Sequence, residues 1–295
     1  MRRFVSALVR SDVPLRVLLV TSAVIGFSTL PAIAQQRPLL TEDPEPIGAG
    51  RILLEGGLNL AHDEHYPVSG LAGNLVSIPT IGVSVGLSSI AEFQIDGGFH
   101  DRLHITSRNP GAPLAPLVTS TGDVTTDVED IVVATKIRVV GETPSRPALG
   151  LRFATKLPNA TNESGLGLDT MDFYVSALGA KTVQSVRIVG NLGAGILSDP
   201  IVGNRQNDVL TYGVSFARAV TQAAEIVGEV NGRVSTRSGV AFPGTETRGI
   251  LKVGGRYTRG SARLDAGLFF GLTSVDPTVG FTVGVTYVFN AFTVP

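Results

Sequence analysis

Segments in which apolar and polar residues alternate run along most of this sequence, and the clearest is the hairpin of residues 130–158. In its first arm, Ile131 and Val133 fall on one face and Lys136 and Arg138 on the other, and its second arm alternates in the same way. Alternation with a period of two predicts β-strands. Arms of about 11–13 residues, tilted by about 40°, would span roughly 25–30 Å, the height of a membrane's hydrocarbon layer. Strands in soluble sandwiches have only about 5–6 residues, so this hairpin predicts transmembrane strands.

The same alternation recurs along the chain and predicts twelve strands. They fall at residues 51–60, 80–87, 91–100, 130–140, 148–158, 171–180, 185–197, 209–218, 223–235, 248–258, 261–270 and 280–292. Short turns at residues 88–89, 141–147, 181–184, 219–222 and 259–260 alternate with longer connections. Short turns at one end, long loops at the other and an even strand number are typical of bacterial outer-membrane barrels. The sequence therefore predicts an all-β fold, a transmembrane antiparallel up-and-down β-barrel of twelve strands in the bacterial outer membrane, with both termini in the periplasm.

A soluble β-sandwich or lipocalin-like barrel is the alternative, and it would bury the apolar face of each strand and expose the polar face. The predicted strands are about twice the usual soluble length, and their polar faces contain many glycines. Aromatic residues fall on the apolar faces, several near strand ends, where membrane barrels carry aromatic girdles. They are Phe99, Phe153, Phe173, Tyr212, Phe216, Tyr257, Phe270, Phe281, Tyr287 and Phe289. These observations favour the membrane barrel.

The start of the chain has the features of a secretory signal peptide. Four arginines precede or flank the apolar run 17–30, and Ala32-Ile33-Ala34 provides a cleavage site with small residues. We predict a signal peptide at residues 1–34, a periplasmic lead-in at 35–50 and the barrel at 51–295. The chain has no cysteine and a formal net charge of −1. These properties exclude disulfides, thiolate metal sites and thiol nucleophiles, and they give no reason to expect a nucleic-acid partner.

Three stretches between residues 130 and 173 carry a family resemblance. They are DIVVATKIR (130–138), PALGLRFATKLP (147–158) and GLGLDTMDF (165–173). They resemble the outer-membrane transporter family named for the MetA pathway of phenol degradation, in which Thr-Gly usually follows the proline where this chain has Asn159-Ala160. The resemblance implies a porin-like channel for passive diffusion of small solutes, with aromatic or other hydrophobic compounds as candidates. It brings no catalytic residues.

Charged residues lie on the polar faces of the predicted strands, which in a membrane barrel line the lumen. A lumen of twelve strands would be about 10 Å across once side chains fill both walls. The candidate lumen and selectivity residues are Asp96, Asp130, Lys136, Arg138, Arg152, Lys156, Asp172, Arg187, Glu229, Arg233, Arg248, Lys252, Arg256, Arg263 and Asp265. One interpretation is a charged constriction that selects solutes, and the other is a set of salt bridges that holds the barrel together. Basic residues outnumber carboxylates on several strands, so we expect the pore to favour anions.

Enzymatic and metal sites find little support in the sequence. The weak metal candidates are His62, His65, His100 and His104. Imidazole and carboxylate groups bind Zn²⁺ or Cu²⁺, but no tight His-x-x-x-His spacing is present, so solvated histidines at the barrel rim are the simpler interpretation. We therefore predict no metal and no cofactor. No motif marks a nucleophile, so we predict a protein that is not an enzyme. The alternatives are a structural or adhesion barrel without transport and, more weakly, an outer-membrane hydrolase.

Residues 101–127 form the longest predicted connection. Three prolines and a Thr/Ser-rich end disfavour strand pairing, and Leu103, Ile105 and Leu114 need burial. We therefore expect this loop to fill or cover the outer mouth of the pore. The expected partners are outer-membrane lipid, a small-molecule solute and the barrel-assembly machinery. The last strand departs from the usual assembly signal, because the chain continues past Phe292 instead of ending at an aromatic residue.

Overall fold

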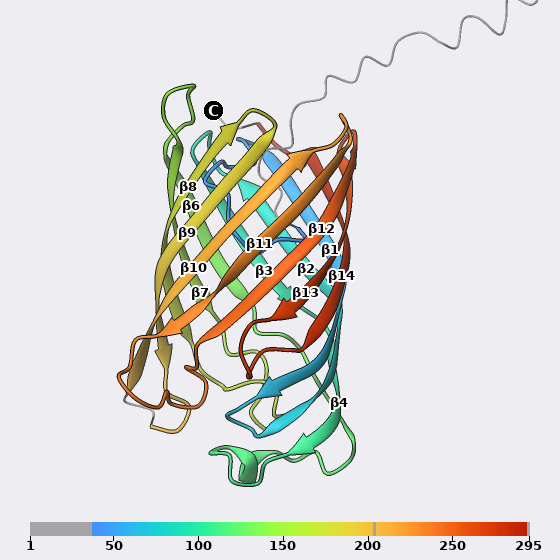
Figure 1. The fold of residues 1–295 in the computed structure, drawn as a ribbon, viewed down its shortest axis with the longest axis vertical. Coiled ribbons are helices and arrows are strands. Elements are labelled where there is room, and N and C mark those ends of the chain that lie inside the picture. The colour runs from blue at the N-terminus through green and yellow to red at the C-terminus, as the bar shows by residue number, and fades with distance from the viewer. Residues whose placement is uncertain (1–36, 203–204, 294–295) are drawn as a thin grey trace, which may run out of the picture. The chain divides into compact units, whose positions relative to one another are not determined.

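The computed structural model describes residues 37–202 and 205–293, which form a closed antiparallel β-barrel (Figure 1). The predicted signal peptide at residues 1–34 lies outside the described residues. Within the described ranges, no helix is long and apolar enough to cross a membrane.

All strand pairings in the barrel wall are antiparallel, and they follow the order of the chain except that β4 pairs with β2 and β6 pairs with β3. The strands are β1 (Arg51–Tyr66), β2 (Leu71–Gly86), β3 (Ala91–Gly98), β4 (Asp101–Arg108), β5 (Val124–Asp127), β6 (Val132–Val140), β7 (Ala148–Lys156), β8 (Asp172–Val183), β9 (Val186–Ser198), β10 (Gln206–Ala219), β11 (Ala224–Ser235), β12 (Arg248–Arg259), β13 (Ala262–Gly271) and β14 (Val279–Asn290). Strand β1 pairs with both β2 and β14, which closes the sheet. Because β4 continues β3 along β2 and β5 continues the course of β6, the strands occupy twelve positions around the barrel. The predicted all-β, twelve-stranded barrel is confirmed.

The two faces of the wall differ as the alternation predicts. On β10, Val214 is 59% exposed whereas its neighbour Ser215 is 3% exposed, and on β8 Phe173 is 49% exposed whereas Asp172 is 5% exposed. Apolar side chains cover the outside, and polar or charged side chains lie inside. This is the arrangement of a bacterial outer-membrane barrel, in which lipid contacts the outer face.

The two ends of the barrel differ in their connections. One end, here called the turn end, carries the short connections 87–90, 141–147, 184–185, 220–223 and 260–261, and the last strand ends there (Figure 1). The opposite end, here called the loop end, carries the connections 67–70, 109–123, 157–171, 199–205, 236–247 and 272–278.

An extension of the sheet stands at the loop end, and we call it the blade. It consists of the loop-end halves of β1 and β2 together with β4 and β5 (Figure 1). Pro79 lies where β2 changes its partner from β3 to β4, because proline has no N–H group for the ladder. The strands predicted at residues 51–60 and 80–87 therefore extend further, into the blade, and the connection predicted at residues 101–127 was wrong in part, since β4 and β5 belong to the blade.

The blade has a small apolar core of its own. Leu103, which is 0% exposed, packs with Leu71 and Ile105, and Val118 and Leu166 cover this core. The connection 109–123, with a short 3-10 turn at Ala115–Leu117, folds over the blade. None of the residues 101–127 lines the two lumen cavities described below. Leu103, Ile105 and Leu114 are buried outside these two cavities, so the expectation that the loop fills the pore was wrong, and a role in covering the outer mouth stays a prediction.

Substitutions on opposite faces of β10 test the orientation of the wall. Val214→Arg puts a charge on the lipid face near the middle of the strand, where an arginine costs about 2–4 kcal/mol. Thr211→Arg puts the same charge into a lumen cavity, where we expect the free energy of folding to change by less than about 0.5 kcal/mol. Urea-dependent folding into liposomes measures both values. Equal losses of folding free energy would contradict this orientation.

Candidate functional site

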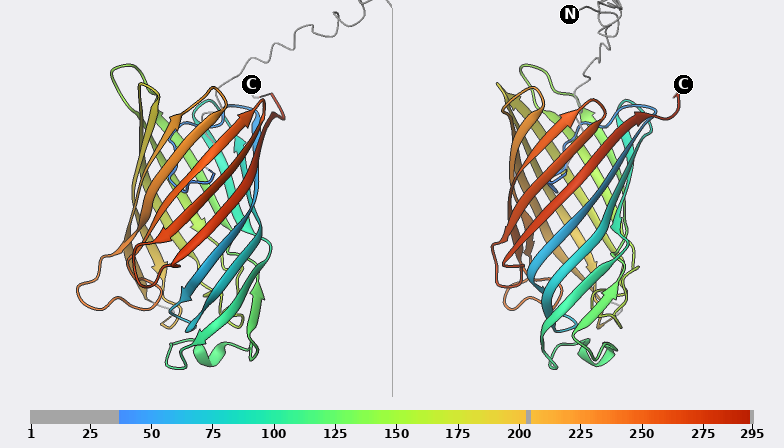
Figure 2. Two further views of the ribbon diagram at one scale, coloured as in Figure 1. Left: turned by 45° about the vertical axis from the view of Figure 1, so that its right-hand side comes forward. Right: turned by 90° about the vertical axis from the view of Figure 1, so that its right-hand side faces the viewer.

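A segment that the sequence predicted to be periplasmic lies inside the barrel. Residues 37–50, here called the lumen segment, run through the part of the lumen next to the turn end (Figure 2). This corrects the predicted lead-in at residues 35–50 for its described part. The segment forms no helix or strand, so its backbone groups need partners from elsewhere. Side chains of the barrel wall provide them.

The first part of the lumen segment is held mainly through its backbone. Glu229 on β11 accepts hydrogen bonds from the N–H groups of Leu40 and Thr41, at 2.8 Å each, and from the hydroxyl of Thr41 at 2.7 Å. Lys252 on β12 donates to the carbonyl oxygen of Pro38 at 2.8 Å. Glu229 is 2% exposed, so these bonds satisfy polar groups that would otherwise be buried without partners.

Arg37 fixes the start of the lumen segment. Its guanidinium donates to the hydroxyls of Thr80 and Thr282, at 3.1 Å each, and lies 3.6 Å from a carboxylate oxygen of Asp265. Its carbonyl oxygen accepts a hydrogen bond from Arg256 Nε at 2.7 Å. These contacts tie the start of the segment to β2, β12, β13 and β14.

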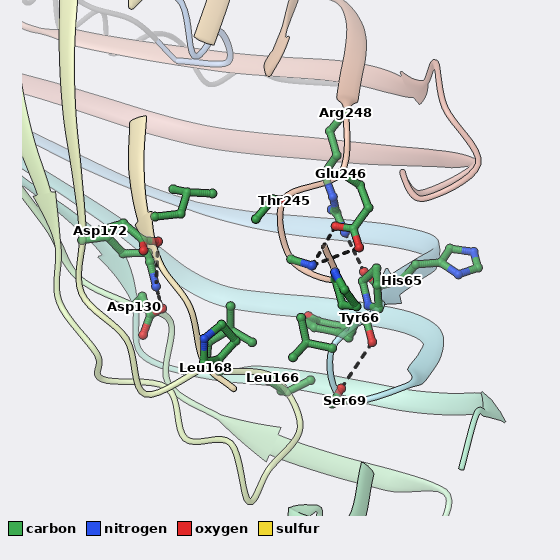
Figure 3. Close-up of a pocket in the computed structure, with 18 of the residues that line it drawn as sticks. His65, Tyr66, Ser69, Asp130, Leu166, Leu168, Asp172, Thr245, Glu246 and Arg248 are labelled. Atoms are coloured by element: carbon green, nitrogen blue, oxygen red, sulfur yellow. Dashed lines mark hydrogen bonds and ion pairs between the residues drawn. The ribbon is translucent and has the colours of Figure 1, made fainter. Parts of the chain in front are cut away.

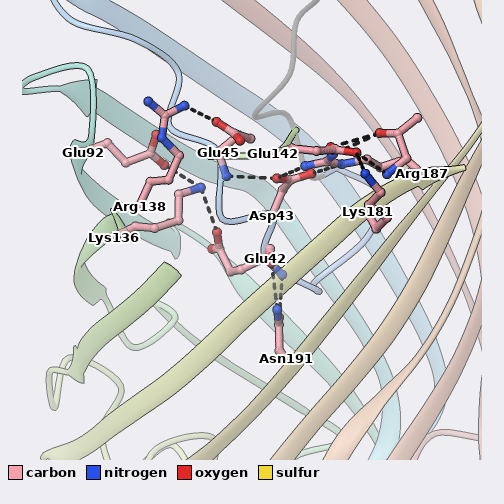
Figure 4. A network of polar contacts seen from close by, with 11 residues as sticks. Glu42, Asp43, Glu45, Glu92, Lys136, Arg138, Glu142, Lys181, Arg187 and Asn191 are labelled. Atoms are coloured by element: carbon pink, nitrogen blue, oxygen red, sulfur yellow. Dashed lines mark hydrogen bonds and ion pairs between the residues drawn. The ribbon is translucent and has the colours of Figure 1, made fainter. Parts of the chain in front are cut away.

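The second part of the lumen segment carries three carboxylates, and each is paired with a cation of the wall (Figure 4). The pairs are Glu42 with Lys136 at 3.3 Å and Arg152 at 3.2 Å, Asp43 with Arg187 at 2.7 Å, and Glu45 with Arg138. Arg187 binds both carboxylate oxygens of Asp43, in the forked geometry that makes arginine–carboxylate pairs strong. Asn191 adds reciprocal hydrogen bonds of 2.7 Å to the backbone of Glu42.

Lys136 is the most enclosed of these cations. Its side chain is 0% exposed, and its Nζ lies 3.0 Å from Glu92 and 3.3 Å from Glu42. Glu92 also accepts a hydrogen bond from the N–H of Ile47 at 2.7 Å. Removing one partner of a buried ion pair costs about 3–5 kcal/mol. The barrel wall and the lumen segment therefore form one ion-pair network, and moving the segment away would remove ion-pair partners from buried charges of the wall.

The lumen segment contacts most of the barrel wall. Its polar bonds reach strands β2, β3, β6, β7, β9, β11, β12, β13 and β14. A lumen of this strand number is about 10 Å across, so a peptide with side chains bonded to opposite walls leaves little free space. The segment therefore occupies much of this part of the lumen.

Glycines of the wall make room for the lumen segment. A Cβ atom at Gly284 would overlap the guanidinium of Arg37, and one at Gly213 would lie 3.0 Å from Thr41 Oγ1. At Gly150, a Cβ atom would lie 3.0 Å from Pro44 Cβ. These glycines fall on the inner face, so their lack of a side chain leaves the space in which the segment lies.

The lumen segment was not predicted from the sequence, although the sequence contains two signals for it. The stretch Thr41–Glu45 carries three carboxylates within four residues, and the predicted strands carry an excess of cations. The inner faces of the strands also hold the glycines that leave space for a peptide. Neither signal repeats regularly along the sequence, so the alternation that predicts the strands does not show that the segment and the strands contact each other.

Arg187 extends this network to the turn end. It also pairs with Glu142 in the connection 141–147, where Glu142 accepts a hydrogen bond from the N–H of Thr182 at 2.8 Å and lies 3.4 Å from Lys181. Burial acts to raise the pKa of Glu142, but the Thr182 hydrogen bond and the charges of Arg187 and Lys181 outweigh it and lower that pKa below its usual value. Glu142 is therefore ionised at neutral pH.

The structure places the predicted lumen residues on the inner side and brings them into three groups. The first group binds the carboxylates of the lumen segment and comprises Lys136, Arg138, Arg152 and Arg187, with Asp96 3.7 Å from Arg152. The second surrounds the start of the segment and comprises Glu229, Lys252, Arg256, Arg263 and Asp265. The third lies toward the loop end and comprises Asp130, Lys156, Asp172, Arg233 and Arg248. Most of these charges are paired, as the salt-bridge interpretation predicts. Their role in the selection of solutes stays a prediction.

Two adjoining cavities lie on the loop-end side of the lumen segment. The larger, here called the lumen cavity, has a volume of about 690 Å³, and Leu40, Thr41 and Glu42 form part of its lining. The smaller, here called the mouth cavity, has a volume of about 270 Å³ and is lined by the β1–β2 connection and by residues 165–168 and 243–246 (Figure 3). Glu64, Tyr174, Arg233 and Arg248 line both cavities and so mark their junction.

The four histidines lie at the loop-end side of the sheet and have separate contacts. His62 contacts Asn74 at 2.7 Å, and His65 lies 3.5 Å from Asp63. His100 separates β3 from β4, and His104 lies in β4. Among the described residues, no group of three histidine or carboxylate side chains could hold a metal ion.

Comparison with known proteins identifies the fold. No family model and no curated protein matches the sequence, so the family resemblance stays a prediction. Among solved structures, an outer-membrane channel from Pseudomonas putida F1 matches with a TM-score of 0.61 and 14% identity over 84% of this chain and 98% of that chain. The NanC porin matches with a TM-score of 0.49 and 8% identity over 80% and 98%. LpxR from Salmonella typhimurium matches with a TM-score of 0.41 and 9% identity over 79% and 99%. The first match, with a TM-score above 0.5 and only 14% identity, supports the barrel fold and nothing further. The other two have TM-scores below 0.5 and support no conclusion.

Filling an inner glycine should displace the lumen segment. The Cβ atom of Gly213→Leu would lie 3.0 Å from Thr41 Oγ1, whereas the Cβ atom of Gly190→Leu on the neighbouring strand would have no atom within 4 Å. We expect Gly213→Leu, and not Gly190→Leu, to increase cleavage of the lumen segment by a protease added to the turn-end side of proteoliposomes. Equal protection in both variants would show that the segment is not seated against β10.

Proposed function

We propose that this protein is an outer-membrane channel for small solutes that the lumen segment closes. The observation that carries the proposal is the lumen cavity of about 690 Å³, which ends on Leu40, Thr41 and Glu42. A solute that enters from the loop end reaches the segment before it reaches the turn end. Passage then requires the segment to move aside. In this proposal the loop end faces the outside of the cell and the turn end faces the periplasm, as is usual for such barrels.

Charge in the lumen changes when the segment moves. Arg37, Glu42, Asp43 and Glu45 are its charged residues, so the segment carries a net charge of −2. Its departure removes this charge from the lumen and frees the cations that Glu42, Asp43 and Glu45 neutralise. The open channel therefore favours anions, and the closed state hides this preference.

Small solutes with an aromatic or other apolar part suit this lumen. The lumen cavity is lined by the aromatic residues Tyr174 and Phe269 and by the aliphatic residues Leu178 and Ile250, beside its charged groups. The resemblance to the transporter family of phenol degradation supports the same class of solute. The similar barrel from Pseudomonas putida F1 is named an outer-membrane channel, and we extend that activity to this chain.

A structural barrel without transport is the second candidate, because the same lumen segment that would open a channel also fills it. The two candidates differ in what removal of the segment does. A channel gains conductance, whereas a structural barrel mainly loses stability.

Deletion of residues 38–46 should raise single-channel conductance in planar bilayers several-fold or more, because it removes the peptide that crosses the lumen. Under a KCl gradient, the reversal potential of the deletion variant should shift toward anion selectivity. The triple variant Glu42→Gln/Asp43→Asn/Glu45→Gln keeps the length of the segment and should produce the same shift with a smaller rise in conductance.

Deletion of residues 110–117 serves as the matched control, because this loop folds over the blade and lines neither cavity. It should leave conductance unchanged. If deletion of residues 38–46 gives a folded barrel that conducts no more than the full chain, the structural role is the correct one.

A further inference from the structure

The junction of the two cavities contains two arginines that face one another. Arg233 on β11 and Arg248 on β12 are directly paired across the two strands, and both line the lumen cavity and the mouth cavity. Like charges placed directly opposite each other on neighbouring strands are destabilising. Such a pair needs either nearby carboxylates or a bound anion.

Carboxylates of the protein neutralise this pair only in part. Arg248 donates to Glu64 at 3.3 Å and to the carbonyl oxygen of His65 at 2.8 Å, while its Nε is buried without a hydrogen-bond partner. Arg233 donates only to carbonyl oxygens, those of Gly244 at 2.7 Å and Glu246 at 3.1 Å. Within the described part of the chain, no carboxylate pairs with Arg233. Glu64 thus forms an ion pair with Arg248 alone, and the guanidinium of Arg233 has no ion-paired carboxylate among the described residues.

Other acidic residues of the mouth cavity are already bonded elsewhere. Asp130 and Asp172 both pair with Lys156, at 2.7 and 3.4 Å. Both carboxylate oxygens of Glu246 accept the N–H of Gly244, at 2.9 Å each. Figure 3 shows Arg248 across the cavity from Asp130 and Asp172. These carboxylates lower the charge of the cavity as a whole but do not pair with Arg233.

Apolar groups make up much of the remaining lining of the mouth cavity. They include Leu166, Leu168, Leu197, Val68 and Pro243. Small-molecule sites are typically apolar cavities with a few polar groups that fix the orientation of the ligand. Together the two cavities have volumes suited to a small molecule.

We propose that Arg233 and Arg248 form a binding site for a small organic anion whose carboxylate lies between the two guanidinium groups and whose apolar body, such as an aromatic ring, enters the mouth cavity. Guanidinium groups bind carboxylates through paired, charge-assisted hydrogen bonds. This site rests on the proposed channel function, in which it would be the first binding site for a solute that enters from the loop end. Binding itself needs no movement of the lumen segment.

Benzoate is the probe for this site, and binding to the full chain in detergent is measured by calorimetry. Benzyl alcohol has the same ring without the charge, and acetate has the carboxylate without the ring. We expect benzoate to bind at least about tenfold more tightly than either. Equal affinity for benzyl alcohol would overturn the role of the arginines, and equal affinity for acetate would overturn the role of the cavity.

Variants separate anion binding from a structural role of the arginines. Arg233→Gln should weaken benzoate binding at least about tenfold, but it also removes bonds to the loop 236–247. Arg248→Gln leaves those loop bonds in place and should weaken binding as well. Arg259→Gln, on the same strand as Arg248 but exposed at the turn end, should change nothing. Unchanged affinity in both Arg233→Gln and Arg248→Gln would overturn the site.

The outcome is independent of transport. If benzoate binds as expected but deletion of residues 38–46 gives no conductance, the anion site stands and the channel function fails. If the deletion variant conducts but benzoate binds neither selectively nor through the arginines, the channel function stands and the anion site fails.

Discussion

Ion pairs between the lumen segment and the barrel wall are the interaction on which the rest of this structure depends. A closed barrel encloses its inner face, so cations such as Lys136 cannot be left without a partner. The wall provides some carboxylates, including Glu92, and the lumen segment provides three more. In return, wall side chains such as Glu229 satisfy the backbone of a segment that has no secondary structure. The charged lumen and the closed pore are thus two aspects of one network.

This network divides the lumen into two functional parts. The part near the turn end is filled by peptide and held by paired charges, while the part near the loop end contains the two cavities. At the junction of these cavities, Arg248 pairs with a carboxylate, whereas Arg233 has only carbonyl partners among the described residues. In the proposed channel, a solute that enters from the loop end would therefore meet the arginine pair first and the lumen segment afterwards. In the proposed channel, selection at the loop end and closure toward the turn end would depend on different residues.

The barrel could be predicted from the sequence because lipid and lumen impose a period of two on every strand, so Val214 and Ser215 differ strongly in exposure. The blade was missed because the prolines of residues 101–127 suggested a loop, although Leu103 and Ile105 alternate with polar residues as they do in a strand. The lumen segment has no such period. Its place depends on contacts such as Asp43 with Arg187, which are 144 residues apart in the sequence. The cavity junction depends in the same way on strand register, which pairs Arg233 with Arg248.

The central claim is that the lumen segment must move for a solute to pass, and a reversible cross-link tests it most directly. The chain has no cysteine, and a Cβ atom at Gly213 would lie 3.0 Å from Thr41 Oγ1, so Thr41→Cys/Gly213→Cys should form a disulfide that locks the segment to β10. Single-channel conductance is then recorded before and after addition of a reductant. We expect the channel to be closed while the disulfide is formed and to open after the disulfide is reduced. Equal conductance in the two states, with the disulfide shown to have formed, would contradict it.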